Sequence, residues 1–398
     1  MATAITNDIF WVGVNDRETD LFEALWPLPH GISYNAYLIR DQKTALIDTV
    51  KKDYGENFIR EIQSVLSGGP KIDYLIINHI EPDHSGAIEF LIRRYPEMCV
   101  VGNEKTLRLL NGFYKVPNRT LIVKDRETLC LGNHTLEFVL TPMVHWPETM
   151  MTYEQKTQIL FSGDVFGGFG VLQKGLFDDE VDLDHYIEET RRYFTNVIGK
   201  YAGRVQKALA KLEALPVKIL ASAHGPVYRK DPKKIMELYA QWSRYETEKG
   251  VVIAYASMYG HTKTMAETIA HSLTDHGVEK IKLLDVSHTH ISFIINDIWR
   301  YQGLILGSCT YNTALFPMME LLLSVLDNYH VQNHLLGLFG SYSWGGGALS
   351  ALKKFAEKGA WKVIEPAIEA QCAPSKEVLK QCRELGRAFA QALRITPA

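Results

Sequence analysis

Cysteine is scarce in this chain. Its 398 residues include only five cysteines, and no two of them form a C-x-x-C pair: Cys99, Cys130, Cys309, Cys372 and Cys382. This pattern argues against a disulfide framework and provides no cysteine-based zinc or iron–sulfur site. It is typical of proteins kept in a reducing compartment, so we expect a cytoplasmic location.

Long apolar runs and an excess of one charge are also missing. No run approaches the roughly 18 apolar residues that indicate a membrane helix, and residues 1–10 lack the basic region and apolar core of a secretory signal. The net charge is −3, whereas a nucleic-acid surface would need a strongly basic balance or patch. We therefore expect a globular protein with no membrane segment and no nucleic-acid partner, and its length favours two domains.

The first part of the chain begins with strand-like segments and continues with strands alternating with helices. Segments 9–14, 34–40 and 44–50 have β-branched and aromatic residues between turn formers, and 55–66 has helical spacing of apolar residues. Further strands are expected at 99–102, 120–123, 134–140, 150–153 and 158–161, with helices from about 85 and at about 184–200 and 205–212. This order predicts a sandwich of two sheets covered by helices.

Near residue 250 the pattern changes. A polar connector, 246–250, precedes expected strands at 251–256, 280–285, 303–307 and 334–339, with helices at 262–275, 290–298, 317–328 and 345–357 between and after them. A final helix is expected at 376–393. Regular strand–helix alternation predicts a parallel sheet wound on both faces. We therefore divide the chain into domains 1–249 and 250–398.

Potential metal ligands are concentrated in one segment, His79-Ile80-Glu81-Pro82-Asp83-His84. It follows the apolar run 74–77, which has the character of a buried strand and would hold the loop rigidly. Three more candidates come at or soon after the ends of apolar segments in a similar way: His145, Asp164 and His224.

These four histidines and three carboxylates suffice for two metal ions with one carboxylate between them. Imidazole and carboxylate ligands suit first-row transition metals. A single histidine is more often structural, but seven such residues at strand ends favour a metal site. Four other residues are candidates for the surrounding shell, although a structural role is the commoner one for each: Glu148, Trp146, His30 and Tyr193.

The expected second domain offers a site for a phosphate. Ser257-Met258-Tyr259-Gly260-His261-Thr262 joins its first strand to its first helix and matches neither a Walker loop nor G-x-G-x-x-G. Free N–H groups at the start of a helix, together with its dipole, bind phosphate. Taken alone, this loop is more often a plain turn with a capping threonine.

Two later loops favour a cofactor. They follow the third and fourth strands of the second domain and so share its carboxyl edge, where ligands bind in such sheets. The candidates in them are Ser308, Cys309, Thr310, Tyr311, Asn312, Ser341, Tyr342, Ser343, Trp344 and Gly345. Small residues, backbone amides and aromatic rings beside a phosphate loop indicate bound flavin mononucleotide (FMN).

With these motifs in place, nearly the whole chain resembles the flavodiiron proteins (A-type flavoproteins). The resemblance implies an α/β fold: a metallo-β-lactamase-like αββα sandwich followed by a flavodoxin-like doubly wound parallel sheet. Its most specific element is H-x-E-x-D-H, followed by His145, Asp164 and His224. Hydrolases of the lactamase superfamily carry histidine where Glu81 stands, and a carboxylate there favours iron over zinc.

The resemblance assigns His79, Glu81 and His145 to one iron and Asp83, His84 and His224 to the other, with Asp164 bridging. Members of the family differ in whether the histidine at the position of His84 binds metal. The implied activity is reduction of dioxygen to water, of nitric oxide to nitrous oxide, or both, with electrons relayed through FMN. Rubredoxin-like proteins and a reduced deazaflavin coenzyme are the donors that the family implies, and a head-to-tail homodimer or a dimer of such dimers is the implied assembly.

Two other functions compete with this one. The same ligands could bind zinc and activate water, as in a metallo-β-lactamase-like hydrolase with an attached flavodoxin-like module. A pure electron carrier with an inactive first domain is the third possibility. Glu81 argues against the hydrolase, and the complete ligand set argues against the carrier. Preference between dioxygen and nitric oxide stays open, as does the donor.

Overall fold

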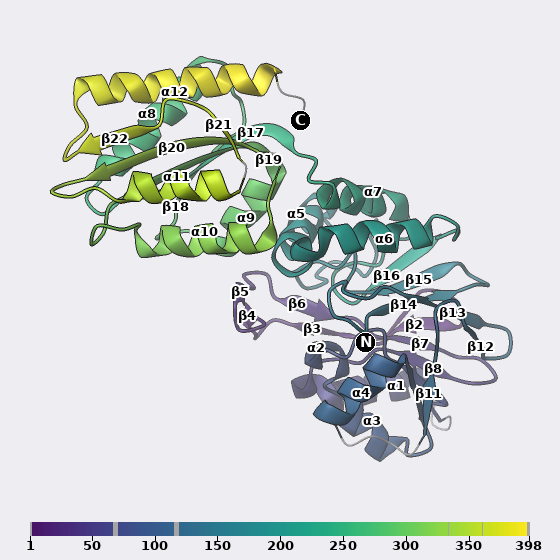
Figure 1. Cartoon of the computed structure of the whole chain (residues 1–398). Helices are drawn as coiled ribbons and strands as arrows, with labels where there is room; N and C mark the ends of the chain where they lie inside the picture. The colour runs from purple at the N-terminus through teal and green to yellow at the C-terminus, as the bar shows by residue number, and fades with distance from the viewer. Residues whose placement is uncertain (1, 67–70, 115–118, 333, 360, 396–398) are drawn as a thin grey trace. The chain divides into compact units, whose positions relative to one another are not determined.

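The chain folds into two compact units, Met1–Ala240 and Gln241–Ala398. The structure is a computed structural model that describes residues 2–66, 71–114, 119–332, 334–359 and 361–395 (Figure 1). The division falls within helix α7 (Pro232–Ser243), whereas the boundary expected between 249 and 250 falls within strand β17 (Glu248–Ala256). The limits of the two domains as independently folding pieces stay a prediction.

Two sheets build the first unit. The larger has the order β1-β2-β7-β8-β9-β10-β11 and the smaller the order β12-β13-β14-β15-β16. The strands of the larger sheet are β1 (Thr3–Ala4), β2 (Ile9–Trp11), β7 (Tyr37–Ile39), β8 (Ala45–Ile47), β9 (Tyr74–Ile76), β10 (Cys99–Gly102) and β11 (Thr120–Ile122). Those of the smaller are β12 (Thr128–Cys130), β13 (Thr135–Leu140), β14 (Met150–Glu154), β15 (Ile159–Gly163) and β16 (Ile219–Ser222).

Two short hairpin-like pairs complete the strands of this unit. β3 (Val14–Asp16) pairs with β6 (Ile32–Tyr34), and β4 (Leu21–Phe22) pairs with β5 (Trp26–Pro27).

The core of the first unit lies between its two sheets. Apolar side chains of both sheets pack together there, among them Ile39, Ile47, Ile76, Phe138 and Phe161, each at most 1% exposed. Helices α1 (Gly55–Leu66), α2 (Pro82–Ser85), α3 (Ile88–Arg94) and α4 (Glu104–Phe113) lie beside the larger sheet, and α5 (Leu183–Tyr193) and α6 (Ala202–Leu212) beside the smaller one (Figure 1). The expected αββα sandwich is confirmed.

The second unit contains one parallel sheet. Its order is β18-β17-β19-β20, and both β21 (Lys362–Val363) and β22 (Ile368–Gln371) pair with β20. The other strands are β18 (Ile281–Asp285), β19 (Tyr301–Cys309) and β20 (Leu335–Tyr342). Helices α8 (His261–Asp275) and α12 (Lys376–Ile395) cover one face, and α9 (Ile291–Arg300), α10 (Pro317–Tyr329) and α11 (Ala348–Lys358) the other (Figure 1). The doubly wound sheet is confirmed.

Among the described residues, no helix is both long and apolar enough to cross a bilayer.

Candidate functional site

The segment His79–His84 turns sharply after β9. Glu81 has extended backbone angles (φ −55°, ψ 142°) and precedes the single turn of α2, with Pro82 at its first position. The Ser85 hydroxyl donates to the Ile80 carbonyl oxygen at 2.7 Å and so closes the turn. A proline is suited to the first turn of a helix because it has no N–H to leave unpaired.

One group of side chains, which we call the Glu81 half-site, consists of His79, Glu81, His145 and the Oδ2 atom of Asp164. Glu81 Oε2 lies 3.0 Å from His79 Nε2 and 3.1 Å from His145 Nε2. Asp164 Oδ2 lies 3.4 Å and 3.2 Å from the same two nitrogens. One oxygen or nitrogen from each of the four residues lies within 4.8 Å of all the others, so these atoms can share one metal ion.

The Asp83 half-site consists of Asp83, His84, His224 and the Oδ1 atom of Asp164. Asp83 Oδ2 lies 3.2 Å from His84 Nε2 and 3.4 Å from His224 Nε2. Asp164 Oδ1 lies 2.8 Å from His84 Nε2 and 3.4 Å from His224 Nε2. The His84 imidazole therefore points into the site together with the other candidates.

The two half-sites meet at Asp164, whose two carboxylate oxygens face different groups. Buried polar atoms normally form hydrogen bonds, yet several atoms here have no hydrogen-bond partner in the described chain. They are Oδ1 and Oδ2 of Asp83 and of Asp164, and Nε2 of His84, His145 and His224. Unpartnered donor atoms of the kinds that bind transition metals, all directed at one place, fit two metal ions with one bridging carboxylate.

The electrostatics of the site favour positive charge. Burial disfavours the imidazolium form, but the close carboxylates of Asp164 and Glu81 raise the pKa of His145 to about 9. The close carboxylates of Asp164 and Asp83 likewise overcome burial and raise the pKa of His224 to about 10. Burial alone would raise the pKa of Glu81, but its histidine neighbours lower it far below its usual value. Metal ions would take the place of these protons.

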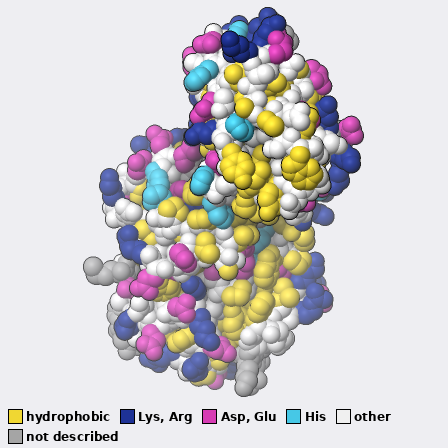
Figure 2. All heavy atoms as spheres, turned by 90° about the vertical axis from the view of Figure 1, so that its left-hand side faces the viewer, with side chains coloured by type: hydrophobic (Ala, Val, Ile, Leu, Met, Phe, Trp, Pro, Cys, Tyr) yellow, Lys and Arg dark blue, Asp and Glu magenta, His cyan; other side chains and the backbone are white. Residues whose placement is uncertain are grey.

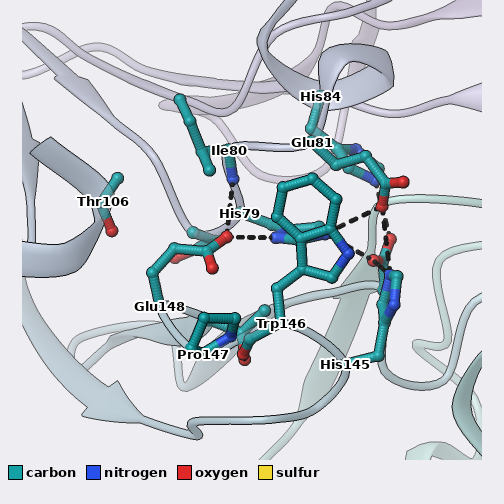
Figure 3. A network of polar contacts seen from close by, with 12 residues as sticks. His79, Ile80, Glu81, His84, Thr106, His145, Trp146, Pro147 and Glu148 are labelled. Atoms are coloured by element: carbon teal, nitrogen blue, oxygen red, sulfur yellow. Dashed lines mark hydrogen bonds and ion pairs between the residues drawn. The ribbon is translucent and has the colours of Figure 1, made fainter. Parts of the chain in front are cut away.

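Atoms behind the ligands orient them. His79 Nδ1 lies 2.7 Å from Glu148 Oε1 (Figure 3), and His224 Nδ1 donates to the Ser33 carbonyl oxygen at 2.7 Å. The Thr49 hydroxyl donates to the His84 carbonyl oxygen at 2.8 Å. The first two contacts hold the His79 and His224 imidazoles with Nε2 toward the metal, and the third fixes the backbone of His84.

The four residues considered for the surrounding shell differ in position. Beside Glu148, the ring of Trp146 lies 5.1 Å from that of His79, and the Tyr193 ring lies 5.3 Å from that of His224. His30 instead packs its ring against His185, at 4.7 Å. Sequence reasoning missed Ser33 and Thr49, and nothing in the sequence could have marked Ser33, because its backbone carbonyl makes the contact.

A cavity of about 860 Å³ adjoins the half-sites, and Glu81 and Asp83 form part of its wall. The other residues that line it include Phe22 of β4, Tyr34 at the end of β6, Lys51, and Phe113 and Tyr114 at the end of α4. It leads to the unpartnered Asp83 oxygens, so a small molecule could approach both half-sites from this side.

In the second unit, the three loops considered for FMN meet at the carboxyl edge of the sheet. The hydroxyl oxygens of Thr262 and Ser341 lie 2.8 Å apart, which links the first loop to the third. Thr310 N–H donates to the Ser341 carbonyl oxygen at 2.7 Å and so links the second loop to the third. Ser308 and Cys309 are the buried last residues of β19, and Ser341 and Tyr342 end β20.

The first of these loops has the features of a phosphate site. Gly260 precedes α8 with φ +90°, and a Cβ atom added there would meet no atom of the described residues within 4 Å. Ser257 Oγ accepts from Gly260 N–H at 3.1 Å and from Lys263 N–H at 3.3 Å. The open space beside Gly260 and the start of a long helix fit a phosphate group.

Aromatic rings are exposed around the same edge. Tyr259 is 85% exposed, Trp344 81% and Tyr311 43%. Figure 2 faces this edge and shows hydrophobic side chains in yellow on its surface. Rings left in solvent beside a phosphate site fit the stacking of a flat cofactor ring. The other candidates, Met258, His261, Asn312, Ser343 and Gly345, lie in the same three loops.

Fold and site together define a β-lactamase-like domain with a candidate two-metal site, joined to a flavodoxin-like domain. Residues 32–225 match the family described as ODP family beta lactamase, and residues 253–386 match Flavodoxin. The anaerobic nitric oxide reductase flavorubredoxin of Escherichia coli K12 is 33% identical over 404 residues, which cover 100% of this chain and 84% of the relative. The chain therefore belongs to the flavodiiron protein family.

Solved structures agree with this assignment. The rubredoxin oxygen:oxidoreductase of Desulfovibrio gigas has a TM-score of 0.93 at 29% identity and covers 99% of both chains. The flavodiiron protein of Giardia intestinalis has a TM-score of 0.94 at 25% identity and covers 99% of this chain and 97% of its own. A flavoprotein of Thermotoga maritima has a TM-score of 0.88 at 28% identity, with 99% of both chains covered.

Proposed function

We propose that this protein is an oxidoreductase that reduces dioxygen to water, nitric oxide to nitrous oxide, or both. The observation that carries the proposal is the position of Asp164, whose two oxygens face two separate groups of buried, unpartnered ligand atoms. Named relatives include a nitric oxide reductase flavorubredoxin and a rubredoxin:oxygen oxidoreductase, which supports the same activity.

The Glu81 half-site would hold one iron and the Asp83 half-site the other, with Asp164 between them. FMN would lie against the loops 257–262, 308–312 and 341–345. When bound, the reduced flavin and the diferrous pair each supply two electrons, which together meet the four electrons that dioxygen needs. The chain itself orients the imidazoles through Glu148 and Ser33, and its aromatic-lined cavity admits a small gas to the site.

The test of this function is anaerobic turnover. Purified protein is reduced, then mixed with dioxygen or with nitric oxide, and dioxygen consumption or nitrous oxide formation is followed. Iron analysis and a flavin absorption spectrum accompany the rates. Iron with flavin and turnover of at least one gas is the expected result. Zinc in place of iron would indicate the hydrolase, and flavin without metal would indicate an electron carrier.

Electron delivery and assembly follow from the same proposal. A rubredoxin-like protein or a reduced deazaflavin coenzyme would reduce the FMN, and the protein would act in the cytoplasm, consistent with five free cysteines. A head-to-tail homodimer, or a dimer of such dimers, would bring the FMN of one chain to the iron site of another. The exposed rings of Tyr259 and Trp344 support a covered surface at the flavin edge. Sedimentation analysis and reduction assays with each donor test these points.

Glu81→His should move the purified protein from iron toward zinc and abolish gas reduction. The change replaces an oxygen ligand beside His79 and His145 with a third imidazole, which recreates the softer ligand set of the hydrolases. Metal analysis beside turnover measures the effect. Glu81→Asp, which keeps a carboxylate, is the matched control and should stay selective for iron. A Glu81→His protein that remains iron-loaded and active would rule out Glu81 as a ligand.

A further inference from the structure

A buried carboxylate lies directly behind one of the candidate ligands. Glu148 is 1% exposed, and its Oε1 atom lies 2.7 Å from His79 Nδ1 and 3.2 Å from the Ile80 amide nitrogen (Figure 3). His79 thus lies between two carboxylates, because its Nε2 atom is 3.0 Å from Glu81 Oε2. Glu148 lies on the side of the His79 ring that faces away from the half-site, so it would affect a metal ion only through that imidazole.

The charge of Glu148 has little other compensation. In the described parts of the chain, His79 is the one side chain that forms an ion pair with it, and its second oxygen, Oε2, has no hydrogen-bond partner. A buried carboxylate without a cationic partner is costly. Its negative charge is therefore balanced through the His79 ring, and through whatever cation that ring binds.

Within the described residues, no carboxylate forms a hydrogen bond with an imidazole of the other half-site from behind. The buried carboxylate of Asp48 acts on His84 through its charge alone, without a hydrogen bond to the ring. His224 Nδ1 donates to a neutral acceptor, the Ser33 carbonyl oxygen, at 2.7 Å. His84 Nδ1 is buried and has no hydrogen-bond partner within the described residues. An imidazole whose N–H is held by a carboxylate is a more basic ligand than one held by a carbonyl.

We propose that Glu148 is a positioning residue that makes the two half-sites electronically unequal, with the Glu81 half-site the stronger electron donor to its metal. This inference rests on the proposed two-metal function and adds to it an order of the reduction potentials of the two half-sites. The half-site with the more basic ligand stabilises the more oxidised ion, so of the two one-electron potentials the lower one belongs to the Glu81 half-site. The Glu81 half-site should also bind a divalent probe ion more tightly than the same half-site would without Glu148.

Glu148→Gln tests the proposal, because glutamine has the same shape and can still accept from His79 Nδ1–H while lacking the charge. Chain stripped of metal is titrated with Co²⁺ and followed by absorbance. We expect one of the two dissociation constants to rise about 10- to 100-fold, with the other unchanged. In iron-loaded protein, a redox titration should show the lower potential shifted upward and the higher one unchanged. Glu148→Asp, which retains the charge, should restore part of the difference.

The chain offers a matched control in a second buried pair. Glu154 is 0% exposed, and its Oε1 atom lies 3.0 Å from Nδ1 of His134, a residue outside both half-sites. Glu154→Gln removes the same charge from the same kind of pair. It should lower thermal stability without changing either Co²⁺ constant or either potential.

Three results would overturn the proposal: no change in Glu148→Gln, equal changes at both half-sites, or the same change in Glu154→Gln. Circular dichroism confirms that each variant is folded. The Co²⁺ titration needs neither iron nor gas turnover, so a failure of the proposed reductase activity is distinguishable from a failure of the Glu148 assignment.

Discussion

Asp164→Ala is expected to give a folded chain that binds no iron in either half-site, reduces neither gas and still carries FMN. The reason is that Asp164 serves both groups: Oδ1 lies 2.8 Å from His84 Nε2, and Oδ2 lies 3.2 Å from His145 Nε2. A bridging carboxylate also offsets the repulsion between two cations held close together. Iron analysis should fall from about two ions per chain to well under one.

Asp83→Ala is the matched control for this loss. Asp83 contacts His84 and His224 and no residue that belongs to the Glu81 half-site alone, so its removal should weaken one metal ion far more than the other. Flavin should be retained in both variants, because the loops considered for FMN belong to the other compact unit. If Asp164→Ala kept one full equivalent of iron at normal affinity, Asp164 would not be a bridge.

The sequence predicted that the candidate metal ligands lie close together, because strand ends are visible in a sequence. Each candidate comes at or soon after the end of an apolar segment that the structure shows as a strand: β9 before His79, β13 before His145, β15 before Asp164 and β16 before His224. β15 and β16 are parallel neighbours and therefore end at the same edge of the sheet. The order of the candidate ligands along the chain predicts that they lie close together. It does not predict that the two Asp164 oxygens face different half-sites.

The spacing of apolar residues did not predict where the helices are interrupted. A helix was expected from about Ser85, but two short helices, α2 and α3, occupy this stretch, separated at Gly86 and Ala87. A Cβ atom on Gly86 would lie 2.5 Å from the Lys52 amide nitrogen, so the backbone approaches another segment there. Helix α4 was not predicted, and the helix expected to reach residue 200 changes at Phe194 into a π-helical turn. Tertiary contacts of this kind leave little trace in apolar spacing.

In the three loops considered for FMN, the sequence pattern likewise predicted the position of the loops but not the contacts between them. Regular strand–helix alternation placed the three loops at one edge, and the parallel registers of β17, β19 and β20 account for that. The contact between Thr262 and Ser341 links residues far apart in the chain, and a single sequence gives no sign of it. An exposed aromatic ring was expected in each of the two later loops, and Tyr311 and Trp344 are exposed there, although aromatic residues in general are more often buried.

Gly260→Val is expected to weaken FMN binding strongly while leaving iron content unchanged. Gly260 has φ +90°, a conformation that costs a β-branched residue on the order of 1–3 kcal/mol. The valine side chain would also enter the open space beside the start of α8, where the phosphate would approach. If the loop of the variant relaxes to another conformation in the absence of FMN, it must regain the strained conformation when FMN binds. That strain energy corresponds to roughly 5- to 150-fold weaker FMN binding.

Gly277→Val separates backbone strain from the loss of the phosphate site. Gly277 has φ +80° and follows the other end of α8, where an added Cβ atom would lie 3.2 Å from Arg394 Nη2. Both variants should lose thermal stability, but only Gly260→Val should lose flavin, measured by absorbance beside iron analysis. Donor-driven gas reduction should then fail in Gly260→Val, whereas chemically reduced protein should still complete a partial turnover. Normal flavin content in folded Gly260→Val would mean that the phosphate binds elsewhere, because the first loop could not tolerate that side chain and still hold the cofactor.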